Sequence, residues 1–178
     1  MGHIHFPAGR VSEFGMKEPQ TTAREEGTWT YHILLAEDSS ADVGLVRLAL
    51  RDESLDHILH VAKDGEEAIV FIQDADRGSK SPPLDLLLLD MHLPKHNGEE
   101  ILKCLRSTEH YAQTPVIVMS SSDAPADHET AQKHAALIYF RKPSTLAEFI
   151  ELGKIVKNIL TGVGPVRPGI PIRTSEGA

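Results

Sequence analysis

The stretch that decides the fold of this chain is Leu86-Leu87-Leu88-Leu89-Asp90-Met91-His92-Leu93-Pro94. Four consecutive leucines are typical of a strand that is covered on both faces, as in a parallel sheet between two layers of helices. Chemistry in such sheets lies just beyond the carboxyl ends of the strands, which is where Asp90 stands. The carboxylate of Asp90 is therefore placed to meet a substrate.

Short apolar runs alternate with amphipathic segments on both sides of this stretch. Strands are expected at residues 33–36, 58–62, 86–89, 115–119 and 137–140, and helices at about 43–50, 66–75, 98–105, 124–134 and 144–159. Parallel strands that are joined by helices have right-handed crossover connections, which place helices on both faces of the sheet. The sequence therefore predicts an α/β fold, a doubly wound five-stranded parallel sheet of flavodoxin-like order 2-1-3-4-5 with five helices.

The first helix is expected to begin with a capping box at Ser39-Ser40-Ala41-Asp42. In this motif the N-cap hydroxyl, here that of Ser39, accepts a hydrogen bond from the backbone N–H three residues on. The acid at that third position, Asp42, accepts a bond from the N-cap backbone in return.

Composition places the chain among ordinary globular proteins, with 40% hydrophobic and 25% charged residues. The formal net charge of -8 provides no basic surface, so we expect no nucleic-acid partner. No apolar run approaches the roughly 20 residues that span a bilayer, and the N-terminus has no secretory signal. We therefore expect a cytoplasmic protein without a membrane segment. Cys104 is the single cysteine, which excludes an intramolecular disulfide.

Three regions are expected along the chain: a flexible N-terminal extension at 1–30, a globular domain at 31–160 and a tail at 161–178. Glycine and proline exclude a helix in the tail, although several of its other residues are apolar. Two interpretations of the tail stay open, a disordered end and an arm that docks on a second copy. The second interpretation predicts a homodimer.

Polar residues follow four of the expected strands. Glu37 and Asp38 follow the first strand, Asp90 ends the third, Ser120 ends the fourth and Lys142 follows the fifth. The first and third strands are neighbours in the expected order, so the three carboxylates should converge at the topological switch point. Repulsion among these acids favours a hard divalent cation such as Mg²⁺, while a lysine and a hydroxyl suit a phosphoryl oxygen. The set predicts phosphoryl transfer with a carboxylate as the nucleophile.

These motifs resemble the receiver domain of bacterial two-component response regulators, over about residues 31–160. The resemblance rests on Glu37-Asp38, the leucine strand with Asp90, Leu93-Pro94, Asn97-Gly98, Ser120 and Lys142-Pro143. It implies a single-domain response regulator, a signalling protein rather than an enzyme. Its phosphoryl group would come from a sensor histidine kinase, and it would assist its own metal-dependent phosphorylation and dephosphorylation.

The resemblance also implies which residues form the metal site. Asp90 would be the phosphoacceptor, and Asp38 would be a direct ligand of Mg²⁺ or Mn²⁺. Glu37 would hold the metal through water, and His92 would contribute its backbone carbonyl.

Three further roles follow from the same resemblance. Lys142 would bind the phosphoryl group, and Ser120 would be the switch hydroxyl. Tyr139 would be the aromatic residue whose inward swing reports phosphorylation. The output surface would be formed by the last strand and the helices on either side of it.

Within this family the chain is similar to stand-alone regulators that pair with bacterial phytochromes. Residues 37–43, 63–68 and 93–98 carry the similarity, with the sequences EDSSADV, KDGEEA and LPKHNG. This similarity implies a phytochrome kinase as partner and an output by protein–protein contact. Two residues depart from the pattern, since Asn97 stands where aspartate is common and His92 where asparagine is usual. His92 is either an exposed loop residue or a cover for the phosphoryl group that alters its hydrolysis.

The alternative function is a phosphorylation-independent docking module built on the same fold. That alternative predicts the loss of an acid or of the lysine, and this chain keeps them all. A flavodoxin-like or hydrolytic enzyme would need a glycine-rich phosphate loop after the first strand, where Glu37-Asp38-Ser39-Ser40 stands instead. Phosphoryl acceptance is therefore the favoured function.

Overall fold

The computed structural model describes residues 30–78 and 82–162, and in these residues five strands alternate with five helices. The strands are β1 (Tyr31–Ala36), β2 (His57–Ala62), β3 (Leu86–Asp90), β4 (Val116–Ser120) and β5 (Ile138–Arg141). The helices are α1 (Ser40–Asp52), α2 (Gly65–Asp76), α3 (Gly98–Arg106), α4 (Pro125–Lys133) and α5 (Leu146–Thr161). All strand pairs are parallel, in the order β2-β1-β3-β4-β5, which confirms the predicted fold class and strand order.

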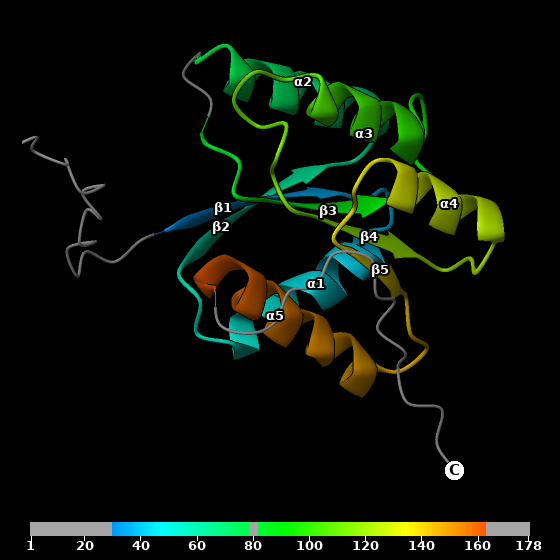
Figure 1. Ribbon diagram of the computed structural model, residues 1–178. Helices are drawn as coiled ribbons and strands as arrows, with labels where there is room; N and C mark the ends of the chain where they lie inside the picture. The colour runs from blue at the N-terminus through cyan, green and yellow to red at the C-terminus, as the bar shows by residue number, and fades with distance from the viewer. Residues whose placement is uncertain (1–29, 79–81, 163–178) are drawn as a thin grey trace, which may run out of the picture.

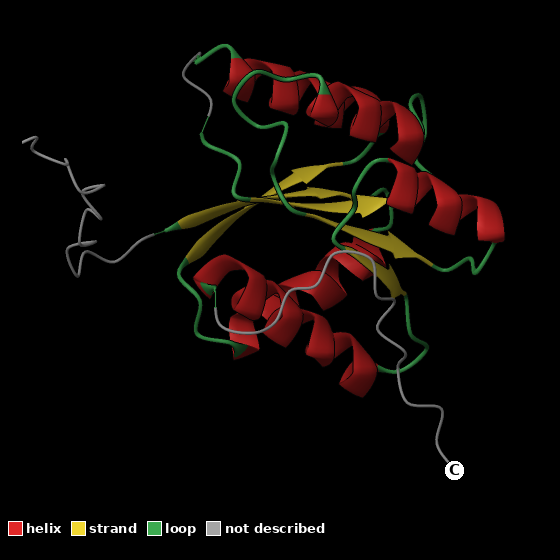
Figure 2. Cartoon of the chain, in the orientation of Figure 1, coloured by secondary structure: helices red, strands yellow, loops and turns green. Residues whose placement is uncertain are grey.

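Helices cover both faces of the sheet, with α2, α3 and α4 on one side and α1 and α5 on the other (Figures 1 and 2). The leucines of β3 divide between the two layers because successive side chains of a strand point to opposite faces. Leu87 and Leu89 join the core beneath α2, α3 and α4, and Leu86 and Leu88 join the core beneath α1 and α5. All four are fully buried, so the predicted double coverage of this strand is confirmed.

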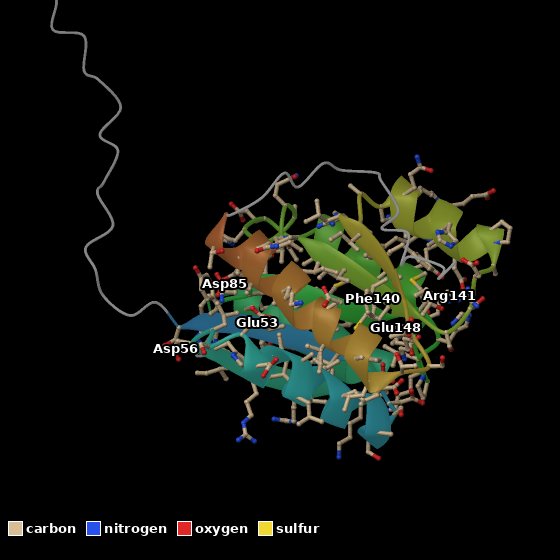
Figure 3. The ribbon with its side chains drawn as sticks, turned by 90° about the horizontal axis from the view of Figure 1, so that it is seen from below. Glu53, Asp56, Asp85, Phe140, Arg141 and Glu148 are labelled. Carbon is tan, nitrogen blue, oxygen red and sulfur yellow. The ribbon has the colours of Figure 1, made fainter. Side chains whose placement is uncertain are left out.

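The register of the sheet brings the carboxyl ends of β1 and β3 together. Ala36 pairs with Leu89, which leaves the residues after β1 beside the end of β3. Figure 3 shows the two ends of the sheet, with Asp56 and Asp85 before the starts of β2 and β3 and Arg141 at the end of β5. The polar residues singled out in the sequence follow the strands at the end marked by Arg141.

The start of α1 corrects the predicted capping box. Ser39 is the N-cap, and its Oγ accepts a hydrogen bond from the Asp42 backbone N–H at 3.3 Å, as expected. The return bond is different, because the Ser39 N–H donates to Glu37 Oε1 at 3.1 Å. The Asp42 carboxylate instead accepts a bond from Lys142, since an ammonium is a stronger partner than a neutral amide.

The predicted extension and tail fall mostly outside the described residues, which include Thr30 at one end and Thr161 and Gly162 at the other. Gly162 ends α5 with a φ of 69°, in the left-handed region that glycine adopts without strain. None of the helices described here combines the length and the apolar content that a bilayer crossing requires.

Helices α1 and α5 lie side by side beneath the sheet, in close backbone contact (Figure 1). A Cβ atom added to Gly153 of α5 would lie 2.1 Å from the carbonyl oxygen of Ala49 in α1. The helices therefore approach each other at a distance that only glycine permits. Gly44, also in α1, has nothing within 4 Å of such an atom.

These two glycines make a matched pair of stability predictions. Gly153→Ala should lower the free energy of unfolding by about 2 kcal/mol, because the backbone of α1 must shift to accommodate the methyl group. Gly44→Ala should raise it by about 0.5–1 kcal/mol, because alanine costs less backbone entropy in a helix. Urea unfolding followed by circular dichroism measures both. Equal effects of the two substitutions would contradict the close packing of α1 on α5.

Candidate functional site

Three acids lie together at the carboxyl ends of the neighbouring strands β1 and β3. Glu37 and Asp38 follow β1, and Asp90 is the last residue of β3. Carboxylate oxygens of all three lie within 4.8 Å of one another. Glu37 and Asp90 are 1% and 7% exposed, whereas Asp38 is open to solvent. The structure thus brings together the acids that the sequence placed at this switch point.

Lys142 follows β5 and reaches across β4 and β3 into this cluster. Its backbone N–H donates to the Ser120 carbonyl at 2.8 Å, which holds the chain beside the end of β4. Its Nζ lies 2.5 Å from Asp90 Oδ2, 2.7 Å from Glu37 Oε2 and 2.9 Å from Asp42 Oδ2. An ammonium has three N–H groups, so these three carboxylates engage all of them.

The third of these contacts, from Asp42, was missed by the sequence analysis. The acid is three residues from the N-cap, and the local pattern of a capping box accounts for it without any partner elsewhere. The available signal was its position in the first turn of α1, about one helical turn after Glu37 and Asp38. This position keeps Asp42 near the carboxyl end of β1, where the acidic pair also lies.

Burial and charge oppose each other at this cluster. Burial tends to lower the pKa of Lys142, but hydrogen bonds to Asp42, Asp90 and Glu37 outweigh it and raise that pKa. Burial raises the pKa of Glu37, and the bond from Lys142 offsets this only in part. Four carboxylates, counting Asp38, face one ammonium, so negative charge is in excess when all are ionised. This excess favours a further cation.

The donor set fits a hard divalent cation. Mg²⁺ prefers oxygen ligands, takes one or two carboxylates from the protein and keeps several waters. Asp38 and Asp90 offer such carboxylates, the exposure of Asp38 leaves room for water, and the buried Glu37 lies close to both. The backbone N–H of His92 donates to Asp90 Oδ1 at 2.8 Å, which fixes the orientation of that carboxylate.

Ser120 is the last residue of β4, and Tyr139 lies within the neighbouring strand β5. Ser120 is fully buried, and its Oγ accepts a bond from the Ser122 backbone N–H at 3.1 Å. The Tyr139 hydroxyl donates to the Ser122 carbonyl at 3.0 Å. The Tyr139 ring is buried and stacks on His128 of α4, with ring centroids 3.7 Å apart. Tyr139 therefore occupies an inward position between β5 and α4.

The His92 side chain lies at the surface, beside α4. It is 62% exposed, and its Nε2 lies 3.7 Å from Asp127 Oδ2 in α4. Of the two interpretations of His92, the exposed loop residue matches this position. Asp127 Oδ2 is buried and has no hydrogen-bond partner within the described part of the chain, and the imidazole of His92 lies beside it.

The loop after β3 is held by a capping box that the sequence analysis did not identify. Asn97 Oδ1 accepts from the Glu100 N–H at 3.1 Å, and Glu100 Oε2 accepts from the Asn97 N–H at 2.9 Å. The Gly98 N–H donates to the Met91 carbonyl at 3.0 Å, and a Cβ on Gly98 would lie 2.6 Å from Met91 Sδ. The asparagine that departs from the common pattern thus starts α3.

Comparison with known proteins identifies the same type of domain. A family model for the response regulator receiver domain matches residues 33–153. The response regulator Rcp1 of Synechocystis sp. is 32% identical over 120 residues, which is 67% of this chain and 82% of Rcp1.

Solved structures show the same likeness. The phosphorylated cyanobacterial phytochrome response regulator RcpA superposes with a TM-score of 0.69 at 26% identity and covers 76% of this chain and 97% of its own. The Mn²⁺-bound form of Rcp1 gives a TM-score of 0.67 at 30% identity, with 75% and 97% coverage. The predicted resemblance to receiver domains, and among them to phytochrome-associated regulators, is confirmed.

The buried Glu37 gives a pH-dependence that can be tested in metal-free buffer with EDTA. Burial raises its pKa, so the folded protein keeps the Glu37 proton to higher pH than the unfolded chain, whose carboxyl titrates near 4.5. The unfolded state then binds fewer protons, and the contribution of Glu37 to stability falls as pH rises from 4.5 towards neutral. Glu37→Gln removes this loss, so its stability relative to the wild type should increase over that window.

Urea unfolding at a series of pH values measures this difference. Glu129→Gln, an exposed acid of α4, is the matched control and should keep a constant offset from the wild type. The same pH-dependence in both variants would show that burial of Glu37 is not its cause.

Proposed function

Because the chain belongs to the response regulator receiver domain family, we propose that it accepts a phosphoryl group on Asp90 from a sensor histidine kinase. The observation that carries the proposal is the contact of the buried Asp90 carboxylate with Lys142 Nζ at 2.5 Å, beside the acids Glu37 and Asp38. These groups are the nucleophile, the phosphate-binding cation and the metal-binding acids that phosphoryl transfer to a carboxylate requires.

The transfer proceeds by attack of an Asp90 carboxylate oxygen on the phosphorus of a phosphohistidine. The new P–O bond forms as the P–N bond breaks, and the histidine of the kinase leaves with the electron pair and takes up a proton. Lys142 donates a hydrogen bond to an oxygen of the phosphoryl group as that group approaches Asp90 Oδ2. The His92 N–H donates to Asp90 Oδ1 and keeps the carboxylate in its orientation. Alignment and fixed positive charge account for most of the rate enhancement in such reactions.

A divalent cation, Mg²⁺ or Mn²⁺, would neutralise charge on the phosphoryl oxygens when it is bound. We assign its direct carboxylate ligands to Asp38 and Asp90, a water-mediated contact to Glu37 and a backbone carbonyl contact to His92. The support is the acidic cluster and the excess of carboxylates over ammonium groups.

Phosphorylation is transmitted through Ser120 and Tyr139. Ser120 moves to donate its hydroxyl to the phosphoryl group, and the Tyr139 side chain, which already lies inward against α4, fills the space that Ser120 leaves. The surface of α4, β5 and α5 changes as a result, and this change alters the affinity for a partner. The stacking of Tyr139 on His128 supports a direct link between this residue and α4.

The kinase partner is proposed to be a bacterial phytochrome. The support is the likeness to Rcp1 and to RcpA, which is described as a cyanobacterial phytochrome response regulator. The competing function, a docking module that works without phosphorylation, is disfavoured because Glu37, Asp38, Asp90 and Lys142 are all present and in place.

Intact mass after incubation with acetyl phosphate and Mg²⁺ tests the phosphoacceptor. The wild-type chain should gain one phosphoryl group, and Asp90→Asn should gain none, because the amide oxygen is a poor nucleophile. Addition of EDTA should abolish the gain in the wild type. A gain in Asp90→Asn would move the acceptor elsewhere, and no gain in the wild type would favour the docking module.

We also propose a homodimer in which the tail beyond residue 160 contacts the second subunit. The proposal rests on the apolar residues of the tail and of the last helix. Light scattering should give a dimer mass for the full chain and a monomer mass after truncation at residue 160. A dimer that persists in the truncated chain would exclude the tail as the contact.

A further inference from the structure

The ammonium of Lys142 also has a hydrogen-bond acceptor outside the group of three acids Glu37, Asp38 and Asp90. Its contact with Asp42 Oδ2, at 2.9 Å, comes from α1, whereas its other two contacts come from the ends of β1 and β3. Asp42 is not among the acids that could share a metal ion in the described residues. Its carboxylate is also free of the capping bond that the sequence predicted, because Glu37 accepts from the Ser39 N–H instead.

The backbone of Asp42 is held firmly. Its N–H donates to Ser39 Oγ, and the next residue, Val43, donates to the Ser39 carbonyl at 3.0 Å. Helix α1 itself packs on α5 through the close contact of Gly153 with Ala49. The Asp42 carboxylate therefore extends from a backbone that is held independently of Asp90.

The three acceptors of Lys142 change differently when Asp90 is phosphorylated. Asp90 then loses its free carboxylate, while Glu37 and Asp42 keep theirs. An ammonium held by Asp90 and Glu37 alone would retain one anchor, and its long, flexible side chain could turn away. With Asp42 present, the carboxylates of Glu37 and Asp42 both still bind the ammonium. Its third N–H then stays directed at the phosphorylated Asp90 side chain.

We propose that Asp42 is a positioning residue for phosphoryl transfer. Together with Glu37 it holds Lys142 Nζ against Asp90 before the reaction and against the phosphoryl oxygen after it. The inference rests on the proposed function, since it concerns the same transfer to Asp90. The proposal gives a residue of α1 a role in the reaction, which is to keep Lys142 in position when Asp90 no longer has a free carboxylate.

A purely electrostatic role for Asp42 makes a different prediction. Asp42→Asn removes the charge but keeps an oxygen that can accept from the ammonium, whereas Asp42→Ala removes both. If Asp42 positions Lys142, the asparagine variant should resemble the wild type and the alanine variant should not. If the charge alone matters, the two variants should behave alike.

The experiment measures the rate of phosphorylation as a function of acetyl phosphate concentration at saturating Mg²⁺. Asp42→Ala should lower the maximal rate constant about tenfold, because a misplaced catalytic group loses alignment. Asp42→Asn should stay within about threefold of the wild type, because one neutral hydrogen bond replaces a charged one. The half-saturating acetyl phosphate and Mg²⁺ concentrations should change by less than about twofold in both, since positioning acts on the reacting complex.

Asp52→Ala is the control, because it removes an exposed acid from the far end of the same helix. It should leave every rate constant unchanged. Asp42→Ser withdraws the carboxylate and keeps a small polar side chain at this partly exposed position, so it replaces the alanine variant if that variant does not fold. The serine variant should show the same tenfold loss.

Two results would overturn the inference while the proposed function stands: a normal rate in both Asp42→Ala and Asp42→Ser, or an equal loss in Asp42→Asn. Absence of phosphorylation in the wild type would overturn the proposed function itself, and the inference with it. A loss in the alanine and serine variants alone, with rescue by asparagine, supports the positioning role.

Discussion

The site depends on one partly buried ammonium that offsets the repulsion of acids delivered by separate elements. Lys142 contacts Glu37 from β1, Asp90 from β3 and Asp42 from α1 at distances between 2.5 and 2.9 Å. Removing the lysine from such a cluster would leave the buried carboxylates of Glu37 and Asp90 unpaired, which is costly. The ammonium therefore sets the positions of carboxylates that would otherwise move apart, and it does so at the place where a phosphoryl group would arrive.

The sheet is what makes this convergence possible. Parallel strands end at the same edge, so residues distant along the chain meet there without any dedicated contact between their helices. The leucines of β3 fill both layers of the core and hold Asp90 at that edge with little freedom. Packing of α1 against α5 holds in place the helix that carries Asp42, the third carboxylate in contact with Lys142. The packed core thus restricts the movement of Asp90 and of the acids that hold Lys142.

Contacts with α4 connect the site to one of the helices in the proposed output surface. His92, two residues after Asp90, approaches Asp127, and Tyr139 stacks on His128, the next residue of the same helix. Ser122, between Ser120 and α4, is bonded to both Ser120 and Tyr139. A change of charge at Asp90 therefore has short physical routes to the first turns of α4, which has little apolar contact of its own to resist movement.

The sequence by itself determined the alternation of elements, the strand order and the polar residues at the strand ends. These follow from hydrophobic periodicity and from the common edge of parallel strands, which are properties of short segments and of the fold class. It did not determine the partner of Asp42. A local capping rule accounted for that residue, and the residue that it actually contacts lies a hundred positions away in the chain. It also passed over the Asn97–Glu100 capping box, although that signal is local. Which carboxylates surround Lys142 was decided by the tertiary structure, because hydrogen-bond partners are set by distance and competing acceptors, and both arise only when the sheet and its helices are assembled.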